Sequence, residues 1–172
     1  ISRLPRLRRS SPISYFSVAA GLSALENAGV KMDAETAART AVVFAVSNGA
    51  VVYTRRFYEQ IVKGGANTAS PMLFPETVYN APASHLAAQL GIDGPSYTLV
   101  GDATVGITAL GFAEQLMDTE DIDRCVVVGA EEGEQPRADH DGVVEPLPCE
   151  ALAGRLQPAD RVVEEARAQH HR

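Results

Sequence analysis

The sequence predicts an α/β protein built as a layered sheet. Residues 41–46 form a continuous apolar run, which is typical of a strand covered on both faces. Segments with helical spacing separate such runs in the order strand, helix, strand, helix, strand. The length of 172 residues, with 45% hydrophobic and 22% charged side chains, fits one compact globular domain with a workable core.

Helix signals precede the first predicted strand. Ser10 or Ser11 can cap a helix that has Pro12 in its first turn, and Gly29 ends this helix. An apolar stripe at helical spacing runs along it: Tyr15, Val18, Leu22 and Leu25. Residues 33–40 are expected to form a short helix or a turn.

The elements after the first strand follow from similar signals. Residues 52–63 show the pattern of a helix that a glycine pair stops. Residues 66–75 contain two prolines and are expected to form a loop. A helix over about 83–90 should end at Gly91. After a further strand and helix, residues 125–128 predict a last buried strand.

The junction between a strand at 97–100 and a helix that ends near Met117 is the most informative stretch. Gly101, Asp102 and Ala103 connect the two elements. A residue at such a junction faces the unpaired N–H groups and the positive dipole end of the helix. A cysteine there would be held as a thiolate, and an oxyanion would be stabilised. Ala103 can do neither.

Asp102 has two interpretations. Its carboxylate could replace the missing nucleophile or base at the start of the helix. Alternatively, it accepts hydrogen bonds from the helix N–H groups as an N-terminal cap, which is the common use of aspartate at this position. We favour the cap.

Five stretches of the chain carry a family resemblance: 3–6 with the helical run to Gly29, 41–49, 70–75 with 80–84, 94–98, and 126–131. Together they resemble the N-terminal half of the β-ketoacyl synthases, the condensing enzymes of fatty-acid and polyketide synthesis. The resemblance covers roughly residues 3 to 131, in short motifs that are individually weak. It implies a thiolase-like layered α/β sheet, of which this chain holds the N-terminal half only.

The resemblance also places the family's catalytic cysteine. Counted from the Gly-Pro pair at 94–95, that cysteine falls on Ala103, the preceding alanine on Asp102, and a small hydroxyl residue on Val105. The small residues of the following helix still match the family. The resemblance therefore implies that the close packing of this helix is kept, while the cysteine nucleophile is lost. The family's later catalytic residues belong to its second half, to which no segment here aligns. We therefore assign no catalytic residue.

The resemblance implies a non-catalytic β-ketoacyl-synthase-like protein of fatty-acid or polyketide-type biosynthesis, a partner or chain-length-factor-like subunit. Chain-length factors often carry glutamine at the junction, so Ala103 departs from that pattern too. The alternative is an acyltransferase (a β-ketoacyl-ACP synthase) or a malonyl-ACP decarboxylase that works without the usual cysteine, since decarboxylation needs mainly oxyanion stabilisation. A degenerate gene product is a third option. We favour the first, because acyl transfer by the family's route needs a covalent thioester.

The resemblance also implies partners. Acyl carrier protein, with its phosphopantetheine-bound acyl chains, is the expected small partner. The strand over 97–101 is the expected two-fold interface of a homodimer, or of a heterodimer with an active ketosynthase, because pairing covers a strand edge. A charged substitution at Leu99 should weaken this interface if that side chain points outward.

Charge and composition exclude other classes. A net charge of −7 argues against nucleic acid as a partner. No apolar run approaches membrane-spanning length and nothing resembles a signal peptide, so we expect a cytoplasmic protein. The two cysteines lie far apart, which suits a reducing cytosol, and we expect no metal and no cofactor. One basic cluster, Arg3, Arg6, Arg8 and Arg9, is interpreted as a solvated entry to a helix.

The character of the chain changes near residue 133. Residues 131–172 hold ten acidic and five basic side chains, four prolines and no aromatic residue. We expect residues 1–133 to form the synthase-like N-terminal domain and residues 134–172 a divergent or poorly structured segment. Because a thiolase-fold subunit has two such halves, the chain is expected to be a fragment or the product of a halved gene.

The remaining candidate groups give weaker signals. Cys125 lies in a strand pattern and is interpreted as an inert core thiol. His85 is interpreted as a packed or surface histidine and not as a base. Cys149 lies in a polar stretch, His140 in a loop between two acids, and the acids at 120–121 are expected to be caps.

Overall fold

The computed structural model describes Leu7 and residues 10–119 and 121–132. The described elements follow in this order: α1 (Pro12–Asn27), α2 (Ala34–Ala38), β1 (Thr40–Val46), α3 (Val51–Gly64), η2 (Ala66–Thr68), η3 (Phe74–Glu76), α4 (Ala81–Leu90), β2 (Ser96–Val100), α5 (Val105–Met117) and β3 (Arg124–Gly129). The alternation of helices and strands expected from the sequence is confirmed. The segment 134–172 and the arginines before Ser10 lie outside the described residues.

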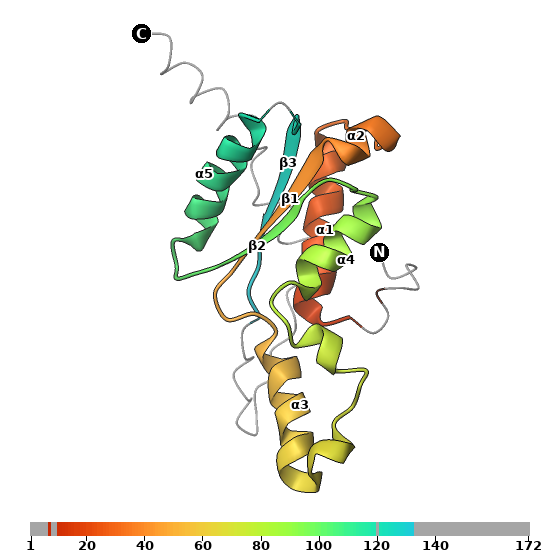
Figure 1. Cartoon of the computed structure of the whole chain (residues 1–172), viewed down its shortest axis with the longest axis vertical. Helices are drawn as coiled ribbons and strands as arrows, with labels where there is room; N and C mark the ends of the chain where they lie inside the picture. Colours follow the sequence, from red (N-terminus) through yellow and green to blue (C-terminus); the bar gives the residue numbers. More distant parts are fainter. Residues whose placement is uncertain (1–6, 8–9, 120, 133–172) are drawn as a thin grey trace, which may run out of the picture. The chain divides into compact units, whose positions relative to one another are not determined.

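The three strands form a parallel sheet in the order β2-β1-β3 (Figure 1). The central strand, β1, is buried at every residue, as its continuous apolar sequence predicted. In the register of the sheet, Ala45 pairs with Leu99 of β2 and with Gly129 of β3. The three strands therefore end side by side, and the segments that follow them begin at the same edge.

Helices cover both faces of the sheet (Figure 1). α1 and α4 pack together over one face, and α5 packs on the other. Because side chains alternate along a strand, β1 supplies both cores. The α1/α4 face buries Val42, Phe44 and Val46 with residues of the two helices: Ile13, Val18, Leu86 and Leu90. The α5 face buries Val43 and Ala45 against Ala109 and Ala113.

Small residues let α1 approach α4 closely. Ser14, Ser17 and Gly21 of α1 are buried, and a Cβ at Gly21 would come within 2.4 Å of Leu86 Cδ1. The predicted stripe of α1 also packs against this core, with Val18 fully buried. One detail differs from the prediction: the Ser11 side chain does not cap the helix, because its hydroxyl bonds to the Ser14 hydroxyl at 2.9 Å.

Glycines end two helices where the sequence predicted. α3 stops at Gly65, with φ of 83°, and α4 stops at Gly91, with φ of 68°. The expected loop over 66–75 contains the short η2 turn and the start of η3. Within the described part of the chain, no helix combines the length and the apolar character needed to cross a bilayer.

Candidate functional site

The β2–α5 junction is a four-residue turn at the carboxyl edge of the sheet. β2 ends at Val100 and α5 begins at Val105. The Gly101 N–H donates to the Val46 carbonyl at 3.1 Å, which ties the turn to the end of β1. Ala103 is exposed in this turn, just before the first helical residue. Its methyl group offers neither a nucleophile nor a proton-transfer group.

The Asp102 carboxylate is held inside the turn. Its Oδ1 accepts hydrogen bonds from the Thr104 N–H at 2.9 Å and from the Thr104 hydroxyl at 2.7 Å. The two hydrogen bonds from Thr104 lower the pKa of Asp102 below its usual value. A carboxylate with a lowered pKa is a weak base, and its nearest donors are already bound. This geometry is a local turn before the helix and not the N-terminal cap that we expected, because Thr104 is the N-cap residue and no side chain caps the N–H groups of α5.

An open cavity of about 380 Å³ adjoins the turn. We call it the junction cavity. It is lined by residues of β2, the turn and the first helical turns: Thr98, Leu99, Val100, Gly101, Asp102, Thr104, Val105 and Thr108. Hydroxyl groups and one carboxylate are its polar groups, so it carries no cationic side chain that would attract an anion.

The Leu99 side chain points toward the α5-side core and not outward, as an interface residue would. Leu99 pairs with Ala45 and packs with it in the α5-side core. Tyr97 points to the same side and forms an edge-to-face pair with Phe112, with ring centroids 5.1 Å apart. Val100 is the more exposed apolar residue of β2, at 52% of its surface. A charge at Leu99 would therefore disturb the core before it disturbed an interface.

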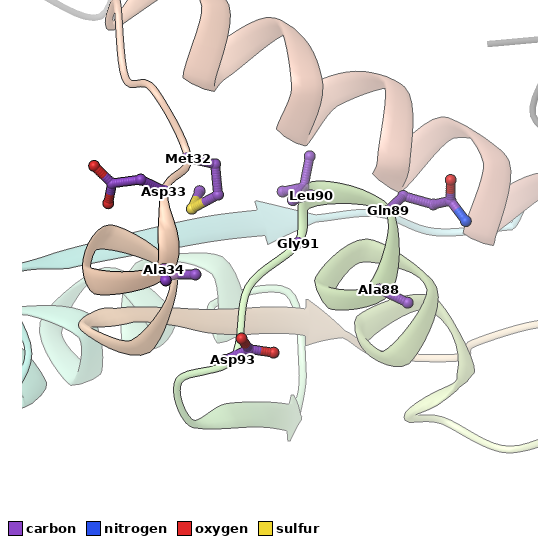
Figure 2. A pocket seen from close by; sticks show the side chains of 9 residues that line it. Met32, Asp33, Ala34, Ala88, Gln89, Leu90, Gly91 and Asp93 are labelled. Carbon is purple, nitrogen blue, oxygen red and sulfur yellow. The ribbon is translucent and has the colours of Figure 1, made fainter.

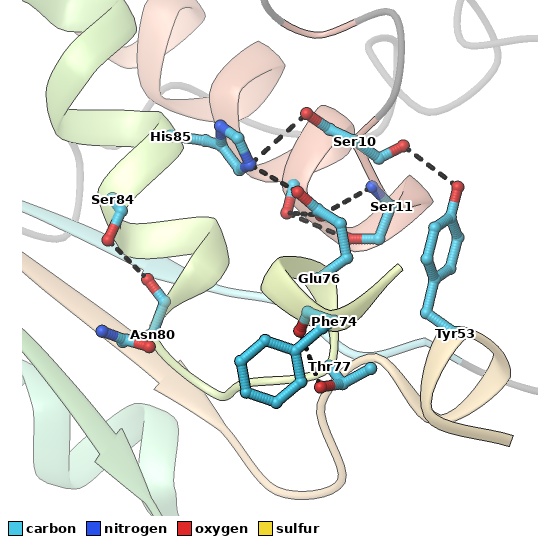
Figure 3. Close-up of polar contacts among 10 residues, drawn as sticks. Ser10, Ser11, Tyr53, Phe74, Glu76, Thr77, Asn80, Ser84 and His85 are labelled. Atoms are coloured by element: carbon cyan, nitrogen blue, oxygen red, sulfur yellow. Dashed lines mark hydrogen bonds and ion pairs between the residues drawn. The ribbon is translucent and has the colours of Figure 1, made fainter. Parts of the chain in front are cut away.

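Sequence reasoning missed a buried polar cluster at the start of α1 (Figure 3). Glu76 of η3 is only 5% exposed. Its Oε2 accepts the Ser11 N–H at 2.7 Å and the Ser14 hydroxyl at 3.1 Å. Its Oε1 lies 2.6 Å from His85 Nε2 on α4. The cluster thus links η3, α1 and α4, and we call it the Glu76 lock.

Hydrogen bonding decides the charge of Glu76. Burial opposes its ionisation, but the hydrogen bonds from His85 and Ser11 outweigh burial and lower the pKa of Glu76 to about 2. The carboxylate is therefore ionised at neutral pH. Only a nonperiodic loop and a run of serines mark this cluster in the sequence, and neither signal is specific.

The Glu76 lock contains serine, histidine and glutamate, but it is not a catalytic triad. In a triad the serine and the acid bind opposite ring nitrogens of the histidine. Here Ser10 Oγ, at 3.4 Å, and Glu76 Oε1 both approach Nε2 of His85. The histidine cannot relay a proton from Ser10 to Glu76 through its ring. The cluster is a structural link, in agreement with the expectation that His85 is a packed histidine.

The other candidates give no site. Cys125 packs in the α5-side core, as expected, and burial raises the pKa of its thiol to about 11, which disfavours the reactive thiolate. Among the described residues, no group of three or more His, Cys, Asp or Glu side chains is arranged to hold a metal ion. Cys149, His140 and Glu120 lie outside the described residues.

A second cavity, of about 400 Å³, lies between the start of α2 and the end of α4 (Figure 2). The carboxylates of Asp33 and Asp93 are its charged groups. Asp33 caps α2 by accepting the Thr36 N–H at 2.8 Å, and this bond lowers the pKa of Asp33. The Asp33 carboxylate in the cavity wall thus serves to cap α2.

Comparison with known proteins identifies the family. The sequence profile of the β-ketoacyl synthase N-terminal domain matches residues 3–139. The chain belongs to this family. It is 29% identical over 129 residues to 3-oxoacyl-[acyl-carrier-protein] synthase 2 of Vibrio cholerae, a match that covers 75% of this chain and 31% of that relative. It is 28% identical over 149 residues to a putative polyketide β-ketoacyl synthase 1 of Streptomyces virginiae, covering 83% of this chain and 33% of that protein.

Solved structures show the same fold. The ishigamide ketosynthase/chain length factor matches with a TM-score of 0.65 at 23% identity, covering 73% of this chain and 36% of that one. A β-ketoacyl synthase from Burkholderia phymatum matches with a TM-score of 0.62 at 20% identity, covering 71% and 31%. The predicted thiolase-like α/β fold, N-terminal half, is therefore confirmed. The chain spans about a third of the length of the curated relatives it matches.

Proposed function

We propose that this chain forms the N-terminal domain, over residues 1–133, of a non-catalytic β-ketoacyl-synthase-like subunit. In this role it pairs with an active ketosynthase, or with a second copy, in fatty-acid or polyketide-type biosynthesis. The observation that carries the proposal is Ala103 in the β2–α5 turn, where a nucleophile would face the start of α5. Acyl transfer through a covalent thioester requires a thiol at that place.

The neighbourhood of Ala103 supports a loss of covalent chemistry. Asp102 is the reactive group nearest to Ala103 in the turn, and its carboxylate is bound by Thr104 with a lowered pKa. The same carboxylate accepts the Thr104 N–H, so this donor of the turn is already bound. These contacts weigh against the alternative of acyl transfer or malonyl decarboxylation without a cysteine.

The outer face of α5 supports association with further protein. Three large apolar side chains on this helix are exposed: Ile107 at 75%, Leu110 at 60% and Met117 at 45%. An apolar stripe of this kind is typical of a surface that another layer covers. Since the chain spans about a third of its relatives' length, we propose that a second, C-terminal half covers this face.

The β2 edge supports the paired state. β2 pairs with β1 on one side, and no strand of the described part pairs with its other side. Val100, at 52% exposure, and Tyr97, at 39%, lie along this edge strand. Pairing two such edges would cover unpaired backbone groups. By similarity to 3-oxoacyl-[acyl-carrier-protein] synthases, we propose acyl carrier protein as the transient partner.

Intact-mass measurement tests the proposal. The full chain is incubated with acyl thioesters of an acyl carrier protein, and an active ketosynthase serves as the positive control. The chain should gain no acyl mass under conditions in which the control is fully acylated. A stable adduct that maps to residues 101–105 would contradict the non-catalytic role and identify Asp102 as the acceptor.

A further inference from the structure

The carboxyl ends of the three strands bring together residues that lie far apart in the sequence. Ala45, Leu99 and Gly129 share one level of the sheet. Ser47 follows β1, Asp102 follows β2 and Glu131 follows β3. The segments after the strands therefore meet at the edge where the β2–α5 turn lies.

Glu131 holds the start of the loop that follows β1. Its Oε1 accepts the backbone N–H of Ser47, and its Oε2 accepts the N–H of Asn48 at 3.0 Å. Hydrogen bonds to a carboxylate are stronger than those between neutral groups, and two of them fix direction as well as distance. The side chain after β3 thus orients the residue after β1.

Ser47 extends this contact to the junction. Its hydroxyl donates to the Asp102 carbonyl oxygen at 3.2 Å. The same oxygen accepts the N–H of Val105, the first residue of α5, at 3.0 Å. A carbonyl oxygen has two lone pairs and can serve both donors. Ser47 therefore contacts the carbonyl oxygen that accepts the N–H of the first residue of α5.

We propose that Glu131 is a positioning residue of the β2–α5 junction. It acts through Ser47 on the Asp102 carbonyl and so sets how the first N–H groups of α5 face residue 103. The inference rests on the proposed function's assignment of this turn as the altered nucleophile turn, and it does not depend on whether the subunit is active.

An introduced thiol makes the effect measurable. In an Ala103→Cys parent of the full chain, the start of α5 should lower the pKa of the new thiol. Its iodoacetamide labelling is followed against pH and located by mass spectrometry. Labelling should be faster than at Cys125, whose pKa burial raises to about 11. Ser47→Ala or Glu131→Gln in this parent should raise the new thiol's pKa and slow labelling near pH 7 by roughly three- to ten-fold.

Two matched variants separate positioning from general loosening. Ser47→Thr keeps the hydroxyl and should retain the parent's labelling profile. Glu132→Gln removes the charge of the adjacent acid, whose Oε2 accepts the Val52 N–H of α3 at 3.0 Å and not a junction group. It should also leave the profile unchanged. The thermal midpoint and Cys125 labelling check that each variant is folded, and Glu131→Gln decides the question if Ser47→Ala unfolds.

The outcomes distinguish this inference from the proposed function. Unchanged labelling in both Ser47→Ala and Glu131→Gln would overturn the positioning role, as would an equal effect of Glu132→Gln. A parent thiol no faster than Cys125 would overturn it together with the assignment of the turn. An acyl adduct on the unmodified chain would overturn the non-catalytic function and leave the positioning role standing.

Discussion

The two faces of the sheet differ in how completely their side chains are buried. On the α1/α4 face, the side chains of β1, α1 and α4 form a closed core, and the Glu76 lock ties its helices together. On the α5 face, the core contains two residues of β1 and two alanines of α5, with partly buried neighbours around them. The outer side of α5 then presents Ile107, Leu110 and Met117 to solvent.

The difference shows which of the two cores is closed by the described residues of this chain. The α1/α4 face has a buried apolar centre, and the polar groups of the Glu76 lock are hydrogen-bonded within it. α5 covers the other face but leaves its own apolar side uncovered. The turn that carries Ala103 leads into this helix, so within the described residues the turn and the exposed apolar side belong to the same element. We infer that a second half packs on the α5 face, whereas the β2 edge serves pairing with another subunit.

Two leucines, one on each face of the sheet, test the difference between the faces, and the buried one should give the largest loss of unfolding free energy. Leu86 of α4 is fully buried, whereas Leu110 of α5 is 60% exposed. Leu86→Ala should lower the free energy of unfolding by about 2–5 kcal/mol, because it leaves a cavity. Leu110→Ala should change it by about 0.5 kcal/mol or less in the same chain. Urea unfolding measures both, and equal losses would mean that the two faces do not differ as described.

Removing the Glu76 lock should give the next largest loss of unfolding free energy. Glu76→Ala would leave the Ser11 N–H, the Ser14 hydroxyl and His85 without their acceptor, at a cost of about 3 kcal/mol. Glu59→Ala is the control, because Glu59 forms an exposed pair with Lys63 at 3.4 Å. That change should cost about 0.5 kcal/mol or less. Urea unfolding measures both variants. Similar losses of unfolding free energy would contradict a stabilising role of the Glu76 lock.

Acid should weaken the same lock. The pKa of Glu76 is lowered from 4.5 to about 2 in the folded chain, so folding favours the ionised carboxylate. Its contribution is present above about pH 4.5, is lost as the pH falls toward 2, and is worth about 3 kcal/mol at most. Unfolding free energies measured between pH 7 and 3 should fall less steeply for Glu76→Gln than for the unmodified chain. Parallel curves would show that Glu76 does not titrate as described.

The sequence predicted the local features well. The apolar run of β1 identified a strand buried on both faces. The glycine pair at 64–65 and Gly91 identified two helix ends, where Gly65 and Gly91 adopt the positive φ that favours glycine. The junction turn was also predictable, since strand and helix patterns meet there. These signals depend on neighbours within a few residues.

Contacts between distant residues were not predictable. The Glu76 lock joins residues 65 positions apart, and no periodicity links Ser11 to Glu76. The direction of Leu99 depends on its register with Ala45, which a single strand pattern does not reveal. The contact from Glu131 to Ser47 arises only because three strands end at one level.

Sedimentation of the full chain shows whether it associates as a partner subunit. The unmodified chain is measured at micromolar concentration, alone and mixed with a cysteine-bearing ketosynthase of the same family. We expect a dimer in at least one of the two samples. Association should be weaker for Val100→Lys, which places a charge on the exposed β2 edge. A well-folded monomer in both samples would contradict the partner-subunit function.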